Sequence, residues 1–241
     1  MKKIICESYE ELSREAAKIL CGEVQANSHA TLGLATGSTP IGAYQEMVKM
    51  YQAGAVDFKD VTTFNLDEYY KIDRTNDQSY YYFMHDNLFN HINIKEENIN
   101  IPNGMVDDPE AECKAYDEKI EKHGGIDLQL LGVGVNGHVG FNEPADEMPI
   151  ATHLTPLTQG TIEVNARFFD KIEDVPTQAL TLGLKGIMAA KKILVLISGE
   201  SKKEAAKKLF SGVVTTSCPV TLLNLHNDVT VILDRDAAQL L

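Results

Sequence analysis

Apolar and polar positions follow one another along the chain in two patterns, and these define the predicted elements. Short, almost continuous apolar runs indicate strands that are buried on both faces of a sheet. Longer stretches in which apolar residues return every three or four positions indicate helices packed on one side. The predicted strands are KKIIC (2–6), ATLGLA (30–35), VTTFNL (61–66), DLQLLGV (127–133), QALTLGL (178–184), KILVLIS (192–198) and VTVILD (229–234).

Helices are predicted between most of these strands. The first begins after Ser8, which forms a capping box with Glu11, and runs to about Ala26. The others are IGAYQEMVKMY (41–51), SYYYFMHDNLF (79–89), the stretch between Asp108-Pro109 and Gly124-Gly125, and SKKEAAKKLF (201–210). This alternation predicts an α/β fold with a mostly parallel sheet and helices on both faces. We expect a single domain over residues 1–241, with a mobile flap in the least regular stretch, 144–177.

Polar segments follow several predicted strands, where a parallel sheet binds its ligands. In LATGSTP (34–40), Gly37 permits a tight bend, and we expect Ser38 or Thr39 to cap the next helix. Free backbone N–H groups at that helix start attract an anion. An ordinary strand-to-helix turn has the same composition, so this segment alone does not decide between the two.

Two acids come directly after the strand VTTFNL. At least one of Asp67 and Glu68 in NLDEYY (65–70) should therefore lie at the mouth of that strand. A carboxylate partly shielded from water there is suited to act as a general base. A helix cap or a solvated turn is the alternative for either acid.

The stretch LLGVGVNGHVGFNEPA (130–145) ends a strand on a glycine-rich bend. We expect Gly132, Gly134 and Gly137 to let the backbone approach a bound ligand. His138 and Glu143 are close enough in sequence for the carboxylate to orient the imidazole, as in a proton-transfer pair. A structural histidine is the alternative.

Composition narrows the classes of function. The chain has 35 acidic against 22 basic residues and a net charge of −13, which disfavours nucleic acid and anionic membranes as partners but leaves a small anion open. There is no apolar run of transmembrane length and no signal-peptide pattern. The four cysteines are widely spaced without a CxxC pair, so we expect reduced, buried thiols in a cytoplasmic protein.

Motifs for bound groups are missing from the sequence. The histidines are scattered, without the spacing of a zinc site. Neither a GxGxxG that opens a helix after the first strand nor a GxxxxGK[ST] loop is present, and GVGVNG lacks the companion acid of a dinucleotide site. We therefore expect an acid/base site that uses no metal and no cofactor.

LATGSTP, NLDEYY, SYYYFM, GVGVNGHVGFNEP, NARFFD and SGESK occur here in the order found in glucosamine-6-phosphate deaminases, which this chain resembles over nearly its whole length. The resemblance implies a modified Rossmann-like sheet. It also implies conversion of glucosamine 6-phosphate and water to fructose 6-phosphate and ammonia, in amino sugar catabolism, without metal or organic cofactor. Some larger relatives are hexamers, so we also consider a homo-oligomer.

The resemblance further implies a role for each matching residue. Asp67 would move the proton from carbon 2 to carbon 1 of the sugar, and His138 would open the ring with Glu143 holding it. Asn136 stands where some relatives have aspartate and would belong to the same network. The implied phosphate ligands are Gly37, Ser38, Thr39, Arg167 and Lys202.

Three alternatives remain. A 6-phosphogluconolactonase shares the fold, but that family has an arginine after its Asp-Glu pair, where this chain has Tyr69, and a Ser-Leu-Phe-Pro run where this chain has FNEP. A galactosamine-6-phosphate deaminase would use the same residues on the epimer. A non-catalytic sugar-phosphate sensor usually carries a helix-turn-helix segment before the sheet, and here the first strand starts almost at once.

Overall fold

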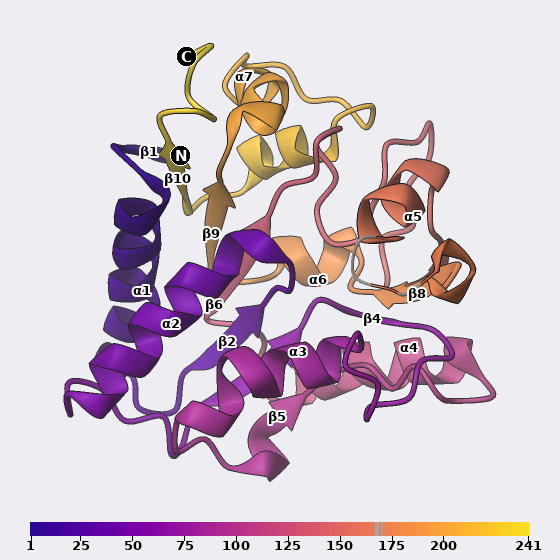
Figure 1. Cartoon of the computed structure of the whole chain (residues 1–241), viewed down its shortest axis with the longest axis horizontal. Helices are drawn as coiled ribbons and strands as arrows, with labels where there is room; N and C mark the ends of the chain where they lie inside the picture. Colours follow the sequence, from indigo (N-terminus) through magenta and orange to yellow (C-terminus); the bar gives the residue numbers. More distant parts are fainter. Residues whose placement is uncertain (167–168, 170) are drawn as a thin grey trace.

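The computed structural model describes residues 1–166, 169 and 171–241, and its central feature is a parallel sheet of seven strands (Figure 1). In spatial order the strands are β1 (Lys2–Cys6), β10 (Val229–Asp234), β9 (Lys192–Ile197), β6 (Leu128–Gly132), β2 (Thr31–Leu34), β3 (Thr62–Asn65) and β5 (Ile99–Asn100). Every pairing in this sheet is parallel. The order reverses between β6 and β2, and this is where such sheets open a crevice at their carboxyl edge.

Strand β9 shows why the apolar runs are continuous. Its side chains alternate between the two faces of the sheet. Ile193 and Val195 belong to one apolar cluster, and Leu194 and Leu196 belong to the cluster on the other face. Because both faces are covered, every buried position of the strand, from Ile193 to Ile197, is apolar.

Helices cover both faces, and the clusters show which helix covers which. α1 (Tyr9–Ala26), α2 (Ser38–Gln52) and α3 (Tyr80–Asn87) contribute to one cluster. α4 (Pro109–Lys122), α6 (Leu184–Met188) and α7 (Lys203–Leu209) contribute to the other. In Figure 1, α2 and α3 cross the near face of the sheet. The predicted α/β fold, a mostly parallel sheet with helices on both faces, is confirmed.

A second, three-stranded antiparallel sheet lies beside the first, in the order β4 (Asp67–Tyr69), β8 (Gln178–Thr181) and β7 (His153–Pro156). The sequence predicted the strand of β8 but gave it no place outside the parallel sheet, and it did not predict β4, β5 or β7. β4 and β5 have only three and two residues, which leave no periodicity to detect, and β7 (HLTP) is not an apolar run. The apolar pattern of β8 reports burial and not the identity of its pairing partner.

The stretch 144–177 is more regular than its sequence predicted. It contains β7, the helix α5 (Gln159–Asn165) and a 3₁₀ turn, Ile172–Asp174. Ile162 and Phe169 from this stretch pack against a small cluster around Tyr69 and Phe141, next to the second sheet. Whether it moves as a flap stays a prediction.

Local signals at the helix ends agree with the sequence in most cases. The Ser8 hydroxyl accepts the Glu11 N–H of α1, but the Glu11 carboxylate accepts the N–H of Glu7, so the capping box is shifted by one residue. Asp108 caps α4 through the Ala111 N–H, with proline in the first turn as predicted. The predicted helix 201–210 is divided into a 3₁₀ turn, Glu200–Lys202, and α7.

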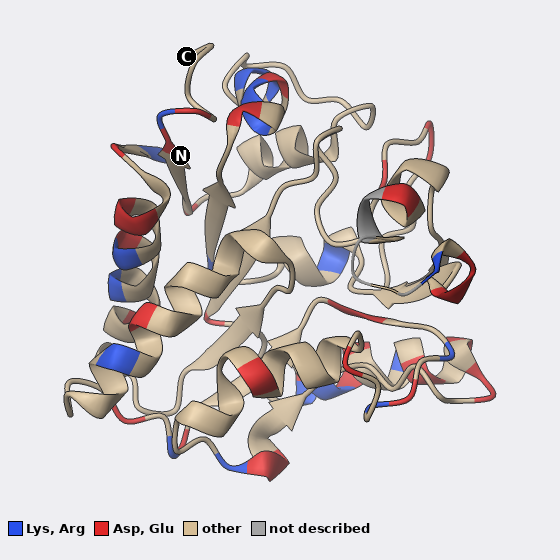
Figure 2. Cartoon of the chain, viewed as in Figure 1, with Lys and Arg blue, Asp and Glu red and all other residues tan. Residues whose placement is uncertain are grey.

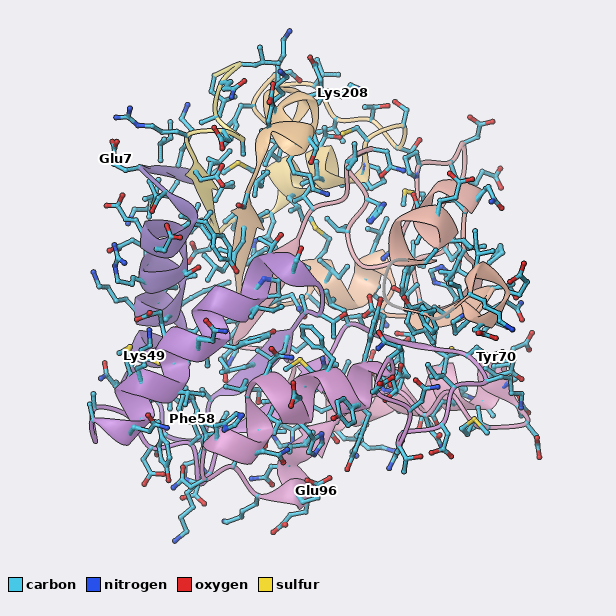
Figure 3. All side chains as sticks on the ribbon, viewed as in Figure 1. Glu7, Lys49, Phe58, Tyr70, Glu96 and Lys208 are labelled. Carbon is cyan, nitrogen blue, oxygen red and sulfur yellow. The ribbon has the colours of Figure 1, made fainter. Side chains whose placement is uncertain are left out.

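The four cysteines are buried and free, as predicted, and burial raises the pKa of Cys21 to about 12 and that of Cys113 to about 11. Acidic and basic residues occur together on α1, α2, α4 and α7 (Figure 2). Charged side chains such as Glu7, Lys49 and Lys208 lie at the outside of the fold (Figure 3). In the described part of the chain, every helix is too short or too polar to cross a membrane.

Candidate active site

A cavity of about 490 Å³ opens where the order of the strands reverses, at the carboxyl ends of β2 and β6. Its walls come from residues 35–40 after β2, Leu66 and Asp67 after β3, the loop 132–141 after β6, residues 158–161, and Lys202. The structure therefore brings all three predicted polar segments to one cavity, because the carboxyl ends of parallel strands share one edge of the sheet.

The connection from β2 to α2 forms one wall. Gly37 precedes the helix with φ 102°, a conformation that favours glycine, as the sequence predicted. Ser38 is already the first residue of α2, and no side chain caps this helix start, so the predicted cap by Ser38 or Thr39 is wrong. The Tyr9 hydroxyl instead holds the first turn: it accepts the Gly42 N–H (2.9 Å) and lies 3.1 Å from the Ser38 and Thr39 carbonyl oxygens.

Asp67 and Glu68 point in different directions, because successive residues of a strand face opposite sides. Asp67 lines the cavity. Glu68 holds the start of α3: its Oε1 accepts the N–H groups of Tyr69 (2.8 Å) and Tyr80 (2.9 Å), and its Oε2 accepts that of Tyr81 (2.9 Å). Glu68 is therefore a helix anchor, as the alternative hypothesis held, and Asp67 is the acid that faces the cavity.

The Asp67 carboxyl group is buried with little to stabilise its charge. Burial raises the pKa of Asp67 to about 8, and the neighbouring Glu68 adds to the rise. Burial also raises the pKa of Glu68 to about 7, against the effect of its three backbone hydrogen bonds. Among the described residues, none donates a hydrogen bond to the Asp67 carboxylate. Such a perturbed acid in a cavity is typical of a proton-transfer group.

The glycines of the loop after β6 do not all have the function that the sequence predicted. A side chain on Gly134 would lie 2.3 Å from the His138 ring, so Gly134 makes room for the imidazole. Gly137 has φ 88° and packs on the Cys218 sulfur. Gly132 alone has open space beside its Cα and leaves the backbone accessible from the cavity.

Glu143 links this loop to the wall formed by residues 158–161. Its Oε2 lies 3.2 Å from His138 Nδ1, an ion-pair distance without hydrogen-bond alignment, and accepts a bond from Asn136 Nδ2 (2.7 Å). Its Oε1 accepts the Thr161 hydroxyl (2.6 Å). Burial raises the pKa of Glu143, but His138, Thr161 and Asn136 together outweigh it and lower the pKa to about 2. Glu143 is thus an anion beside His138.

The Asn136 side chain both donates and accepts a hydrogen bond, which an ionised aspartate cannot do. Its amide nitrogen donates to Glu143 while its Oδ1 accepts the backbone N–H of His138 (3.1 Å). A carboxylate at this position would place a second negative charge next to Glu143. With asparagine at this position, Glu143 is the single anion in the network of Asn136, His138 and Glu143.

Lys202 reaches the cavity from the 3₁₀ turn that follows β9. The bend before it is fixed by Asp234 at the end of β10, which accepts the Gly199 N–H (2.9 Å) and the Ser198 hydroxyl. The predicted phosphate ligand Arg167 lies outside the described residues.

Sequence reasoning missed several residues that shape this site. Thr158 and Thr161 line the cavity, and Thr161 holds Glu143. Tyr80 lines it from α3, and Asp234 positions the bend before Lys202. Asp234 ends an apolar strand, so the signal used for Asp67 was also available there. No local pattern distinguishes the threonines.

A second cavity, of about 570 Å³, lies at the opposite edge of the sheet, beside Thr31 and Thr62 at the start of β2 and β3. Its carboxylates are already paired, Asp60 with Lys95 (2.8 Å) and Asp127 with Lys191 (2.6 Å). It is larger than the cavity at Asp67, but Lys95 lowers the pKa of Asp60, and Lys191 and the Thr31 N–H lower that of Asp127 against the effect of burial, so both acids are paired anions. Across the described ranges, no group of three or more His, Cys, Asp or Glu side chains is arranged to hold a metal ion.

Comparison with known proteins decides the family. The model of the family described as glucosamine-6-phosphate isomerases/6-phosphogluconolactonase matches residues 7–232. The chain belongs to this family. The resemblance predicted from the sequence is thereby confirmed.

Within the glucosamine-6-phosphate isomerase/6-phosphogluconolactonase family, the chain is similar to several proteins named glucosamine-6-phosphate deaminase. It is 54% identical to one from Clostridium perfringens (strain 13 / Type A) over all of both chains. It is 53% identical to one from Thermoanaerobacter sp. (strain X514), covering all of this chain and 95% of the other. A solved structure described as a monomeric glucosamine-6-phosphate deaminase matches with TM-score 0.98 and 45% identity, covering all of both chains.

The 6-phosphogluconolactonases in the same family share the fold at much lower identity. The enzyme from Thermotoga maritima matches with TM-score 0.75 and 20% identity over 97% of this chain and 99% of its own. This likeness concerns the fold alone.

Proposed function

We propose that this protein converts glucosamine 6-phosphate and water to fructose 6-phosphate and ammonia. The observation that carries the proposal is that a buried acid, Asp67, and a histidine, His138, face one cavity at the carboxyl edge of the sheet, with the Glu143 carboxylate 3.2 Å behind the His138 ring nitrogen Nδ1. Similarity over the whole chain to proteins named glucosamine-6-phosphate deaminase supports it.

Ring opening is the first step, because only the open aldehyde acidifies the proton on carbon 2. It requires removal of a proton from the hydroxyl on carbon 1 and delivery of one to the ring oxygen. A histidine suits this transfer near neutral pH. Glu143, which is an anion beside His138 Nδ1, orients the ring and stabilises the imidazolium that forms.

Proton transfer between carbons is the second step. Asp67 as carboxylate removes the proton from carbon 2, which gives an enolamine, and returns it to carbon 1. Carbon 2 then carries an imine, which water hydrolyses to the ketone and ammonia. The raised pKa of Asp67 makes its carboxylate a stronger base than an exposed aspartate.

The phosphate lies at the start of α2. Free N–H groups after Gly37 and the helix dipole attract an anion. Lys202 lines the same cavity and adds a positive charge. Arg167 remains part of the proposal through the family resemblance alone.

The alternative functions are supported to different degrees by the comparisons and by the cavity. The solved structures described as 6-phosphogluconolactonases match at 20% identity or less, whereas the deaminase structure matches at 45%. The galactosamine epimer would use the same residues, and none of the described residues of the cavity separates the two sugars. A homo-oligomer stays a prediction, and the solved deaminase structure is described as monomeric. Four buried free thiols support a cytoplasmic location.

A direct assay tests the function. The protein is incubated with glucosamine 6-phosphate, and ammonia and fructose 6-phosphate are measured together. Formation of both in equal amounts is expected. Galactosamine 6-phosphate and 6-phosphogluconolactone are run in parallel, and a higher kcat/KM on either would replace the proposed substrate.

The pH dependence of kcat/KM is expected to follow the ionisation of Asp67. This acid has its pKa raised to about 8, and the base is the deprotonated form, so kcat/KM should rise with pH and level off above about 8. Glu68→Gln removes the neighbouring negative charge and should move this rise to lower pH. Titration of the substrate affects both proteins equally, so the difference between them reports on Asp67. Identical profiles would contradict the assignment.

Lys202→Ala is expected to weaken substrate binding with a smaller effect on kcat. A charge-assisted contact is worth about 1.5–3 kcal/mol, or roughly tenfold to a hundredfold in affinity. Inorganic phosphate should compete with substrate in the wild type and far less in the variant. Lys203→Ala is the matched control, because the Lys203 ammonium pairs with Glu200 (2.7 Å). An unchanged inhibition constant for phosphate in Lys202→Ala would place the phosphate elsewhere.

A further inference from the structure

Strand β8 contacts both parts of the candidate site, the strand that carries Asp67 and the loop that carries His138. It is the central strand of the small sheet, and its last residue, Thr181, pairs directly with Asp67 of β4. One residue further on, the Leu182 N–H donates to the Leu66 carbonyl oxygen (2.7 Å). The backbone that carries the proposed base is therefore bonded to this strand on both sides of the base.

The same two residues, Thr181 at the end of β8 and Leu182 directly after it, also hold the loop that carries His138. The Thr181 hydroxyl accepts the backbone N–H of Phe141 (3.0 Å). The Asn142 amide donates to the carbonyl oxygens of Leu182 (2.9 Å) and Val139 (3.0 Å). Thr181 and Asn142 are buried, with 0% and 3% of their surface exposed, so these bonds do not compete with water.

Gly140 lies where the loop of His138 meets Thr181 and Asp67. It has φ 58°, and a side chain placed there would lie 3.0 Å from the Thr181 hydroxyl oxygen and 3.6 Å from Asp67 Oδ2. A side chain at residue 140 would be tight against the Thr181 hydroxyl and strained by the left-handed backbone, so glycine lets the loop lie against Thr181 and next to Asp67.

The position of the Asp67 carboxyl group depends on these contacts. Among the residues that the structure describes, no hydrogen-bond donor orients it, in contrast to Glu68 with its three N–H groups. Its place is set by the pairing of β4 with β8 and by the loop packed against it. A misplacement of about 1 Å in a catalytic group can cost a hundredfold in rate.

We propose that Thr181 is a positioning residue that fixes the base Asp67 relative to the ring-opening loop of His138. Its backbone pairs with the base and its hydroxyl binds the loop, so one residue sets the spacing between the two proton-transfer groups. This inference rests on the proposed function, because it assigns a spacing to the two steps of that reaction.

The test compares Thr181→Val with Thr181→Ser. Valine keeps the shape but leaves the Phe141 N–H without its acceptor, whereas serine keeps the hydroxyl. We expect kcat of the valine variant to fall about 10- to 100-fold with KM within about twofold, and exchange of the carbon 2 proton with solvent to fall equally. The serine variant should retain most of the activity.

Thr221→Val is the matched control for loss of a buried hydroxyl. Thr221 is 1% exposed, and its hydroxyl likewise accepts a backbone N–H, that of Thr215 (2.9 Å). A similar change in thermal stability with little loss of kcat is expected. Equal losses of kcat in the two valine variants would assign the effect to general destabilisation and overturn the inference.

The remaining outcomes are also decisive. Unchanged kcat in a folded Thr181→Val protein, or a rise in KM alone, refutes the positioning role while the proposed function stands. If Thr181→Val does not fold, Thr181→Ser is compared with Thr181→Ala, and equal kcat in these two refutes it. Absence of ammonia formation by the wild type refutes the proposed function, and this inference with it.

Discussion

Asp67→Asn is expected to lower turnover at least about 100-fold without destabilising the protein. Asparagine preserves the shape of the side chain but cannot accept the carbon 2 proton. Exchange of that proton with solvent should fall together with ammonia release. An asparagine variant that exchanges the proton at the wild-type rate would show that another group is the base.

Stability provides the control for this variant. The pKa of Asp67 is raised from 3.8 to about 8 by folding, so between these values the unfolded chain has lost the proton that the folded protein retains. The stability of the wild type therefore falls as the pH rises from about 4 to about 8. Asparagine lacks this penalty, so thermal unfolding of the variant relative to the wild type should shift upward over that range. Lower stability throughout it would indicate misfolding as the cause of inactivity.

His138→Gln is expected to have the second large effect, a loss of about 100-fold or more on the ring-closed substrate. Glutamine fills a similar volume over Gly134 but does not titrate near neutral pH. An open-chain substrate analogue bypasses the step, so the loss on it should be much smaller. Equal losses on the closed and open forms would contradict the ring-opening role.

His153→Gln is the matched control for that exchange. His153 lies on β7, and its Nδ1 contacts the Ala151 carbonyl oxygen (2.9 Å), so it is outside the network of Glu143. It should retain wild-type turnover on both substrate forms. Binding of inorganic phosphate should be unchanged in both histidine variants.

Most strands of the main sheet could be predicted, because a strand that is buried on both faces is a short, continuous run of apolar residues. β9, with apolar residues at successive positions facing opposite clusters, is the clearest case. The second sheet could not be predicted in the same way. Its β4 spans three residues, and β8 gives the same apolar signal whether it pairs in parallel or antiparallel.

The residues of the candidate site likewise fall into those that the sequence could predict and those that it could not. Asp67 and His138 were found because they belong to polar segments that follow strand ends, whereas Lys202 was named through the family resemblance alone. The choice between Asp67 and Glu68 required the start of α3, which takes Glu68 as its anchor. The contribution of Thr161 to Glu143 joins residues 18 positions apart, and no periodicity records such a bond.

The sequence by itself determined the α/β order of elements and the polar strand ends, because both depend on residues close together in the chain. The tertiary structure alone decided which side chains share the cavity and what holds them there. Phe141 and Thr181 are 40 residues apart, and their hydrogen bond joins the loop of His138 to β8, the strand that pairs with the strand of the base. Such contacts depend on pairing across the fold, whereas the local pattern specifies only which residues are buried.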